Sequence, residues 1–423
     1  SNFETSLNLR RFLVERFLAS MATMRREVKV KTLDGGDLTV EVIPTNTMKK
    51  FKAFLRKKHC EDPIERQILK VKVLADGLLD DDDQTVESAG LLHGELEVTV
   101  IYSRNEVEAA TKDAMHAEGL LQVNIPSCLT EIPAGAFVGC NQVVKVEIPE
   151  SVTAIGDNAF QDCKSLASIT IPESVTAIGS FSFYSCKCLA RIIIPQSVTA
   201  IGNHAFQDCQ SLASVTIPES VAAIGNGTFA KCESLASITI PQSVTAIGNG
   251  AFIRCSSLTS ITIPESVTVI ESGAFQNCKS LTSITIPYSV TAIAGGAFLG
   301  CSSLTSITIP ESVTVIESGA FQDCKSLESI TIPESMTTIG RDAFRDCKSL
   351  ASITIPVSVT SIEKGTFEGC ESLASITIPD SVTAIGTHAF LGCSSLTRIS
   401  IPESVTIRDN TFDKMCQVER CHV

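Results

Sequence analysis

Residues 165–179 read SLASITIPESVTAIG, and close copies of this stretch return along the chain every 23 residues. Proline keeps the step, standing at positions 126, 149, 172, 195, 218, 241, 264, 287, 310, 333, 356, 379 and 402. Cysteine has the same interval from Cys140 to Cys416, and phenylalanine stands three residues before each cysteine until the last copy, where Phe412 is four before. A fixed period of this length predicts a β-solenoid of thirteen 23-residue turns over residues 119–416, with an atypical last turn as an end cap.

Each position of the repeat has a physical role. The apolar residues before the proline alternate with Ala, Ser and Thr, which predicts a short strand with one face inward. Pro172 ends the strand because proline has no N–H to donate to a neighbouring strand. In this turn the predicted inward residues are Leu166, Ile169, Ile171, Val175, Ile178, Phe183 and Cys186. One turn cannot bury both sides of this layer, so the turns must stack at a strand spacing of about 4.8 Å.

The pattern L-x-x-I-x-I-P-x-S-V-x-x-I-x-x-x-A-F-x-x-C resembles the BspA-like class of leucine-rich repeat, over about seven tenths of the chain. Common leucine-rich repeats place asparagine where this chain has serine, from Ser151 to Ser404, with Cys128 in the first turn. A serine hydroxyl can bond to neighbouring backbone, so this column is expected to extend a hydrogen-bonded ladder from turn to turn.

Residues 26–103 have a different texture. Two strand-like segments, REVKVKTL and DLTVEV, are joined by a turn suited to a hairpin, and MKKFKAFLRKKH at 48–59 predicts an amphipathic helix. This order, with LADGLLDDDDQTV and GLLHGELEVTV after it, resembles ubiquitin-like domains of the α+β (β-grasp) class. The chain lacks a Gly-Gly after Tyr102, so the resemblance implies a built-in domain and not a modifier. It also implies an apolar docking patch at Leu33, Val73 and Thr99, although Thr99 is polar; a folded cap or tether is the alternative.

The remaining segments are short. Residues 1–25 are expected to form an amphipathic helix, residues 104–118 a helical linker and residues 417–423 a C-terminal tail. No run reaches the roughly 18 consecutive apolar residues of a membrane helix, so no membrane span is expected.

Charge and surface columns bear on the partners. The net charge of −13 makes nucleic acid a poor partner. Acidic residues follow most of the prolines, at Glu150, Glu173, Glu219, Glu265, Glu311, Glu334, Asp380 and Glu403, with Gln196, Gln242, Tyr288 and Val357 between them. This column favours solubility, with a basic partner as the alternative.

The outward strand positions repeat Ala or Thr, then Ser, then Thr. Departures from this pattern mark drift or contacts with a protein partner, and they fall at Lys145, Glu147, Arg191, Glu328 and Arg398.

The cysteines and histidines do not predict a catalytic or metal site. Thirteen of the seventeen cysteines form one column, and zinc requires four ligands that converge on a point. We expect these thirteen to be buried, reduced thiols in a reducing compartment, although stacked neighbours about 5 Å apart could form disulfides. The six histidines are scattered and phosphate-binding loops are lacking, so neither enzymatic activity nor a cofactor is expected.

Two functions of different class remain. The first is a non-catalytic, intracellular (cytoplasmic) scaffold of eukaryotic source that binds proteins through the strand face and the ubiquitin-like domain, including a variant in a ubiquitin or proteasome pathway. The second, implied by the BspA-like resemblance, is an adhesin at the extracellular surface. The absence of a continuous apolar leader in residues 1–20 favours the first. The sequence names neither the partner nor the oligomeric state.

Overall fold

The computed structural model describes residues 26–31, 37–42, 70–74, 95–99, 121–125 and 129–421. Two compact units make up the chain, residues 1–197 and 198–423. In the first unit the strands are β1 (Arg26–Lys31), β2 (Asp37–Val42), β3 (Lys70–Leu74), β4 (Glu95–Thr99), β5 (Leu121–Asn124), β6 (Glu131–Ile132), β7 (Val143–Glu147), β8 (Ala154–Ile155), β9 (Ser168–Thr170) and β10 (Ala177–Ile178).

The first four strands form a mixed sheet in the order β2-β1-β4-β3. Strand β1 pairs antiparallel with β2 and parallel with β4, and β3 pairs antiparallel with β4. Strands β1 and β2 coincide with the two segments of the predicted hairpin. The helices expected at 1–25, 48–59 and 104–118 lie outside the described residues.

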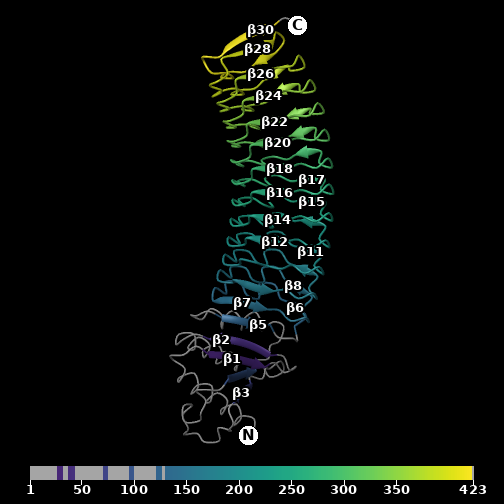
Figure 1. The fold of residues 1–423 in the computed structure, drawn as a ribbon, viewed down its shortest axis with the longest axis vertical. Helices are drawn as coiled ribbons and strands as arrows, with labels where there is room; N and C mark the ends of the chain where they lie inside the picture. The colour runs from purple at the N-terminus through teal and green to yellow at the C-terminus, as the bar shows by residue number, and fades with distance from the viewer. Residues whose placement is uncertain are drawn as a thin grey trace. The chain divides into compact units, whose positions relative to one another are not determined.

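The repeats form a leucine-rich-repeat β-solenoid of about 13 turns. In the second unit the turns before the last have a three-residue strand before the proline and a two-residue strand after it (Figure 1). The strands before the proline are β12 (Ser214–Thr216), β14 (Ser237–Thr239), β16 (Ser260–Thr262), β18 (Ser283–Thr285), β20 (Ser306–Thr308), β22 (Ser329–Thr331), β24 (Ser352–Thr354) and β26 (Ser375–Thr377). The strands after it are β11 (Ala200–Ile201), β13 (Ala223–Ile224), β15 (Ala246–Ile247), β17 (Val269–Ile270), β19 (Ala292–Ile293), β21 (Val315–Ile316), β23 (Thr338–Ile339), β25 (Ser361–Ile362), β27 (Ala384–Ile385) and β29 (Thr406–Ile407). Longer strands close the unit, β28 (Arg398–Pro402) and β30 (Gln417–Cys421).

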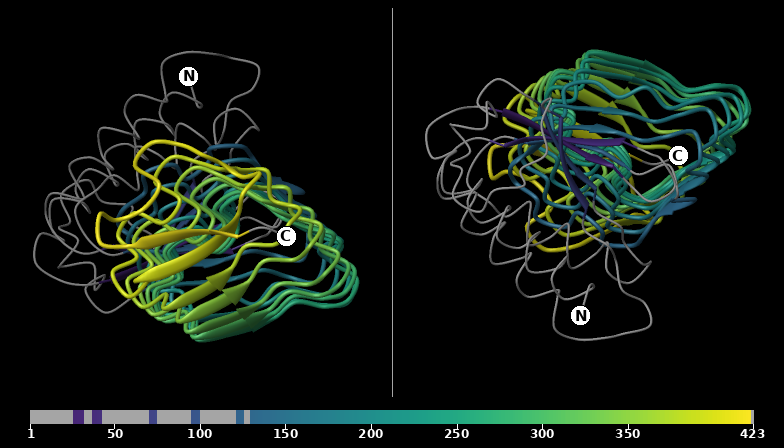
Figure 2. Two further views of the ribbon diagram at one scale, coloured as in Figure 1. Left: turned by 90° about the horizontal axis from the view of Figure 1, so that it is seen from above. Right: turned by 90° about the horizontal axis from the view of Figure 1, so that it is seen from below.

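Successive turns pair in parallel at the repeat offset. Ser260 pairs with Ser283 and Ile261 with Ile284, so each residue lies beside its equivalent 23 positions later. Seen along the stack, the coils of the second unit overlie one another (Figure 2). This register places every position of the repeat in a straight column.

The core is built from these columns. The predicted inward positions are buried in turn after turn; in one turn they are Leu304, Ile307, Ile309, Val313, Ile316, Phe321 and Cys324. The phenylalanine rings of the second unit stack face to face, from Phe206 to Phe412, with centroids 5.3 to 5.7 Å apart and at most 14° between ring planes. Buried aromatic rings at this separation stabilise the fold beyond the burial of their apolar surface. The stacked rings form a continuous spine, and each turn-to-turn contact includes one ring pair.

Side-chain ladders complete the turn-to-turn contacts. The predicted serine ladder is confirmed: Ser312 donates from its hydroxyl to the carbonyl of Val290 at 2.7 Å, and Ser174 does the same to Val152 at 2.6 Å. At a corner, the Asn226 side-chain oxygen accepts the backbone N–H of Asn249 at 2.9 Å. The serine bonds satisfy half-buried carbonyl groups, and the corner bond pairs an exposed backbone N–H with a side chain of the preceding turn.

The last turn differs from the expectation. Thr406 pairs with Ala384, 22 residues earlier, so this turn is one residue shorter before its phenylalanine. Phe412 therefore stays in the stack, 5.3 Å from Phe390, and the slip moves Cys416 out of the buried column to a half-buried position. Residues 417–423 were expected to be a tail, but Gln417–Cys421 form β30, which pairs in parallel with β28.

We expect Phe298→Ala to lower the free energy of unfolding by about 3–5 kcal/mol, because it removes a fully buried ring with a stacked neighbour on each side. Denaturant unfolding followed by circular dichroism measures the change. Ser306→Ala, at an exposed strand position, is the control and should stay within about 0.5 kcal/mol. Equal effects of the two substitutions would contradict the proposed role of the spine.

Candidate protein-binding surface

The wall formed by the three-residue strands is flat and chemically uniform. In β16, β18 and β20 the central isoleucine is buried, and the serine and threonine on either side of it are exposed. Part of this hydroxyl surface is already engaged, since Thr282 Oγ1 donates to the carbonyl of Thr259 at 3.2 Å. Small side chains with engaged hydroxyls give a partner few anchors, so residues that depart from the pattern dominate the character of this face.

In the first unit the predicted departures at Lys145, Glu147 and Arg191 gather on one strand wall. Lys145 and Glu147 lie in β7 and form an ion pair of 2.5 Å, with 41% and 46% of their side chains exposed. Lys145 pairs with Ser168 in β9, and Arg191 stands one repeat beyond Ser168 in the same column, exposed to solvent. The pair partly neutralises Lys145, so Arg191 is the stronger candidate for binding an acidic group.

The two remaining departures on the strand wall belong to the second unit. Glu328 is exposed directly before β22. Arg398 opens β28, and its guanidinium lies 3.4 Å from the Glu419 carboxylate in β30, so this arginine already has an acidic partner within the chain. Leu33 and the side chain of Val73 lie outside what the structure describes.

The sequence analysis missed an exposed isoleucine. Ile193 has 73% of its surface exposed and stands two residues after Arg191, in the column that holds Thr170 one turn earlier. A β-branched apolar residue within RIIIP is easily taken for core. Its position in the repeat could have revealed the exposure. This turn reads RIIIP where others read SITIP, so it departs from the pattern at the arginine and again at the outward position of Ile193.

The turn before this one has a strained backbone on its far wall, at Phe181. Phe181 has φ of 55°, a left-handed conformation that is unusual for a bulky side chain. Its equivalents in other turns are glycine, asparagine, aspartate or histidine, which tolerate this conformation more readily. Phe181 packs edge-on against Tyr184 with ring centroids 5.9 Å apart. The turn before the one that carries Arg191 and Ile193 therefore also departs from the repeat, on its far wall.

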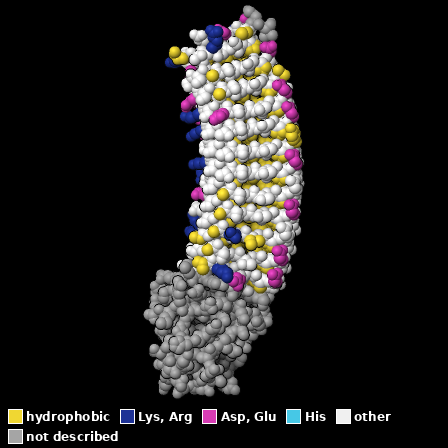
Figure 3. Space-filling model, viewed as in Figure 1, with side chains coloured by type: hydrophobic (Ala, Val, Ile, Leu, Met, Phe, Trp, Pro, Cys, Tyr) yellow, Lys and Arg dark blue, Asp and Glu magenta, His cyan; other side chains and the backbone are white. Residues whose placement is uncertain are grey.

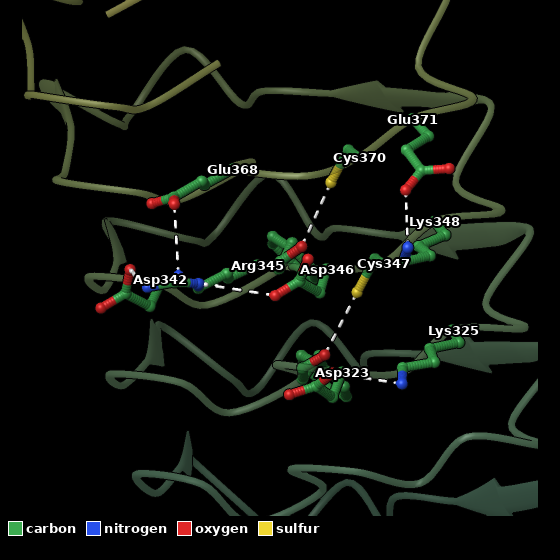
Figure 4. Close-up of polar contacts among 12 residues, drawn as sticks. Asp323, Lys325, Asp342, Arg345, Asp346, Cys347, Lys348, Glu368, Cys370 and Glu371 are labelled. Carbon is green, nitrogen blue, oxygen red and sulfur yellow. Dashed lines mark hydrogen bonds and ion pairs between the residues drawn. The ribbon is translucent and has the colours of Figure 1, made fainter. Parts of the chain in front are cut away.

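The cysteine column has a structural role in hydrogen bonding. From Cys140 to Cys393 the thiols are buried and free. Cys347 and Cys370 donate from Sγ to the carbonyls of Phe321 and Phe344 at 3.1 Å, as Figure 4 shows. Burial raises the pKa of the Cys301 thiol to about 12. The thiolate is the reactive form, so these buried, protonated thiols are expected to be unreactive.

Charged side chains form turn-to-turn contacts on the outside of the same region (Figure 4). The Arg345 guanidinium lies 3.2 Å from Glu368 of the next turn and 3.5 Å from Asp346. Lys348 reaches Glu371 of the next turn at 2.6 Å, and this hydrogen bond raises the pKa of Lys348. More than a third of the Arg345 and Lys348 side chains is exposed, so solvent screening keeps the contribution of such pairs to stability small.

Two other kinds of site are absent from the described part of the chain. No group of three or more His, Cys, Asp or Glu residues there could hold a metal ion. Within the same residues, no helix has the length and apolar character needed to span a membrane.

Comparison with known proteins agrees with the repeat geometry. A family model described as a BspA type leucine-rich repeat region matches residues 112–236, 222–351 and 314–423. The chain belongs to this family. Its members are typically non-catalytic binding proteins, and the repeat implies binding to protein. The search of curated proteins found no match.

Solved structures include similar BspA-type solenoids. A leucine-rich repeat protein from Bacteroides ovatus is 30% identical, with 72% of this chain and 96% of that chain covered and a TM-score of 0.53. A leucine-rich cell surface protein from Faecalibacterium prausnitzii is 32% identical, covering 72% of this chain and 91% of that chain, with a TM-score of 0.51. The pneumococcal vaccine antigen PcpA shares the fold at 20% identity and a TM-score of 0.52. These relatives are bacterial and give no support to a eukaryotic source.

We predict that a thiol reagent labels the native chain fast at Cys188 and Cys421, which are exposed, and slowly at the column from Cys140 to Cys393. The column is shielded from the reagent, and its raised pKa values leave little thiolate. Peptide mapping after labelling before and after denaturation gives the rate at each site. Rapid native labelling of Cys301, or disulfides between neighbouring turns, would contradict the prediction.

Proposed function

We propose that this chain is a non-catalytic, protein-binding solenoid that acts as an adhesin at a cell surface. The observation that carries the proposal is the 32% identity to a cell surface protein, over 72% of this chain and 91% of that one. This likeness favours the extracellular alternative of the sequence analysis over the intracellular scaffold. The repeat supplies the binding scaffold, and departures on its strand wall supply the contacts.

The cysteine column is compatible with an oxidising environment. The expected burial of the column and the ubiquitin-like neighbour suggested a reducing compartment, where thiols stay reduced. The thiols from Cys140 to Cys393 are buried, and burial is the main cause that raises the pKa of Cys278 and Cys301. Their environment protects them wherever the protein resides, so the buried column favours neither location.

The location is tested on intact cells of the organism that makes the protein. An antibody raised against residues 198–423 should label unpermeabilised cells, and external protease should remove that signal while sparing a cytoplasmic marker. Labelling that appears only after permeabilisation would contradict the surface location and favour the intracellular scaffold.

We place the partner contacts on the strand wall around Arg191 and Ile193. The arginine offers a guanidinium for an acidic group, and the isoleucine offers an apolar contact beside it. The Lys145–Glu147 pair lies two repeats away along the same wall. Glu328 and Arg398 are further candidate contacts in the second unit.

The contacts are tested by returning the departures to the repeat consensus. Arg191→Ser and Ile193→Thr should each weaken binding to a partner captured by the intact chain from a native lysate, by about 1 kcal/mol or more. Stability should stay within about 0.5 kcal/mol because both side chains are exposed. Ser237→Ala, at the equivalent strand position of a turn in the second unit, is the matched control and should leave affinity unchanged. Affinity that ignores both departures would remove the strand wall from the binding site.

A second candidate is docking by a ubiquitin-like domain at residues 26–103. It is supported by the sequence motifs and by the mixed pairing of β1 with β2 and β4. Under this alternative, binding would be insensitive to Arg191→Ser and would fall with Leu33→Ala or Val73→Ala. The solenoid would then act as a spacer.

A further inference from the structure

Four consecutive turns of the second unit present an unusual column directly after the proline. The column reads Tyr288, Glu311, Glu334 and Val357, at the position where most turns have glutamate. Tyr288 is 71% exposed and Val357 is 69% exposed, so two large apolar side chains flank two carboxylates. Figure 3 shows acidic side chains spaced along one edge of the repeat with hydrophobic ones between them.

The residues beside this column leave it prominent. The next residue in each turn is a half-buried or exposed serine, and Ser312 turns its hydroxyl to the backbone of the preceding turn. The nearest exposed column after it is threonine, where Thr337 donates to the carbonyl of Thr314. Neither neighbour is charged or large. The aromatic, aliphatic and acidic side chains of the column therefore project from a flat background.

The carboxylates within the column are available. Glu265, one turn before Tyr288, accepts the backbone N–H of Tyr288 at 3.1 Å and so stabilises the chain itself. Glu311 and Glu334 are exposed and form no ion pair among the described residues. A partner can thus neutralise both without breaking an existing contact.

The spacing of the column indicates the form of that partner. Three strand steps of about 4.8 Å separate Tyr288 from Val357 by about 14 to 15 Å. An α-helix lying along the same direction has a pitch of about 5.4 Å, so residues i, i+4, i+7 and i+11 of one face span about 16 Å. The spacing of successive helical turns thus matches the spacing of successive solenoid turns closely enough for all four positions to face one another. Long lysine and arginine side chains absorb the remaining difference.

We propose that Tyr288, Glu311, Glu334 and Val357 form a docking site for a basic amphipathic helix of a partner protein. Apolar side chains at i and i+11 of that helix contact Tyr288 and Val357, and lysine or arginine at i+4 and i+7 contacts Glu311 and Glu334. Charge complementarity selects a basic face, and the two apolar anchors fix its register. The site is separate from the strand wall around Arg191, so either can fail without the other.

The test uses the full chain and a designed peptide probe. The peptide is helical, with leucine at i and i+11 and lysine at i+4 and i+7 on one face; a scrambled peptide of the same composition places these residues on different faces. Titration by fluorescence anisotropy at low and moderate salt gives the dissociation constants. We expect the designed peptide to bind at least tenfold more tightly than the scrambled one, with affinity falling as salt rises.

Variants that copy other turns keep the fold intact. Tyr288→Glu and Val357→Glu restore the common residue of the column, and each should weaken peptide binding at least fivefold. Glu311→Gln with Glu334→Gln uses the residue found at 196 and 242, and should weaken binding and flatten its salt dependence. Glu219→Gln, in the same column outside the four turns, is the matched control and should change nothing.

Three results would overturn the proposal. The first is equal affinity for the designed and scrambled peptides, including no binding of either. The second is an unchanged affinity in Tyr288→Glu and Val357→Glu, which would reduce the surface to nonspecific charge attraction. The third is equal binding of a proline-containing version of the peptide that cannot form a helix, which would assign the column to an extended basic segment.

Discussion

Parallel pairing at an offset of 23 residues is the constraint on which the rest of this structure depends. Ile261 pairs with Ile284 and Ser260 with Ser283, so every position of the repeat forms a column. A side chain in such a column must therefore pack or bond well with the same kind of side chain in the turns on both sides. Phenylalanine meets this condition by stacking, serine by bonding to the backbone, and cysteine by donating to a carbonyl of the preceding turn. Residues that repel their own copies, such as glutamate, are kept out of the buried columns and lie at exposed or half-buried positions, where solvent screens them.

The same constraint explains what the sequence could predict. An inward column is recognised from its period and its apolar character, so the core, the proline stop and the serine ladder followed directly. The exposure of Ile193 was not predicted, because an apolar residue in a strand suggests burial, whereas the same position is exposed in other turns. Cys416 was expected to be buried with its column, but the last turn has one residue fewer before Phe412 and one more after it, and with Phe412 held in the ring stack Cys416 is only half-buried.

The candidate binding surface could be predicted only as a set of residues that depart from the repeat pattern. Periodicity located Lys145, Glu147, Arg191, Glu328 and Arg398, but it could not show that Lys145 and Arg398 already have acidic partners. Pairing of side chains depends on rotamers and on neighbouring strands, which a column pattern does not contain. The expected burial of the cysteine column does not decide the location of the protein, because burial and a raised pKa protect a thiol in either compartment.

The one-to-one register between turns also affects how such a protein changes over generations. A whole repeat added or lost inside the array leaves each remaining residue beside a chemically equivalent neighbour, so no contact of the interior has to be redesigned. Unequal recombination between near-identical coding repeats would therefore lengthen or shorten the molecule in steps of about 4.8 Å without an intermediate that fails to fold. The reach of the protein is free to vary, while the separation of two exposed contacts is preserved only when the inserted turn falls outside the segment between them.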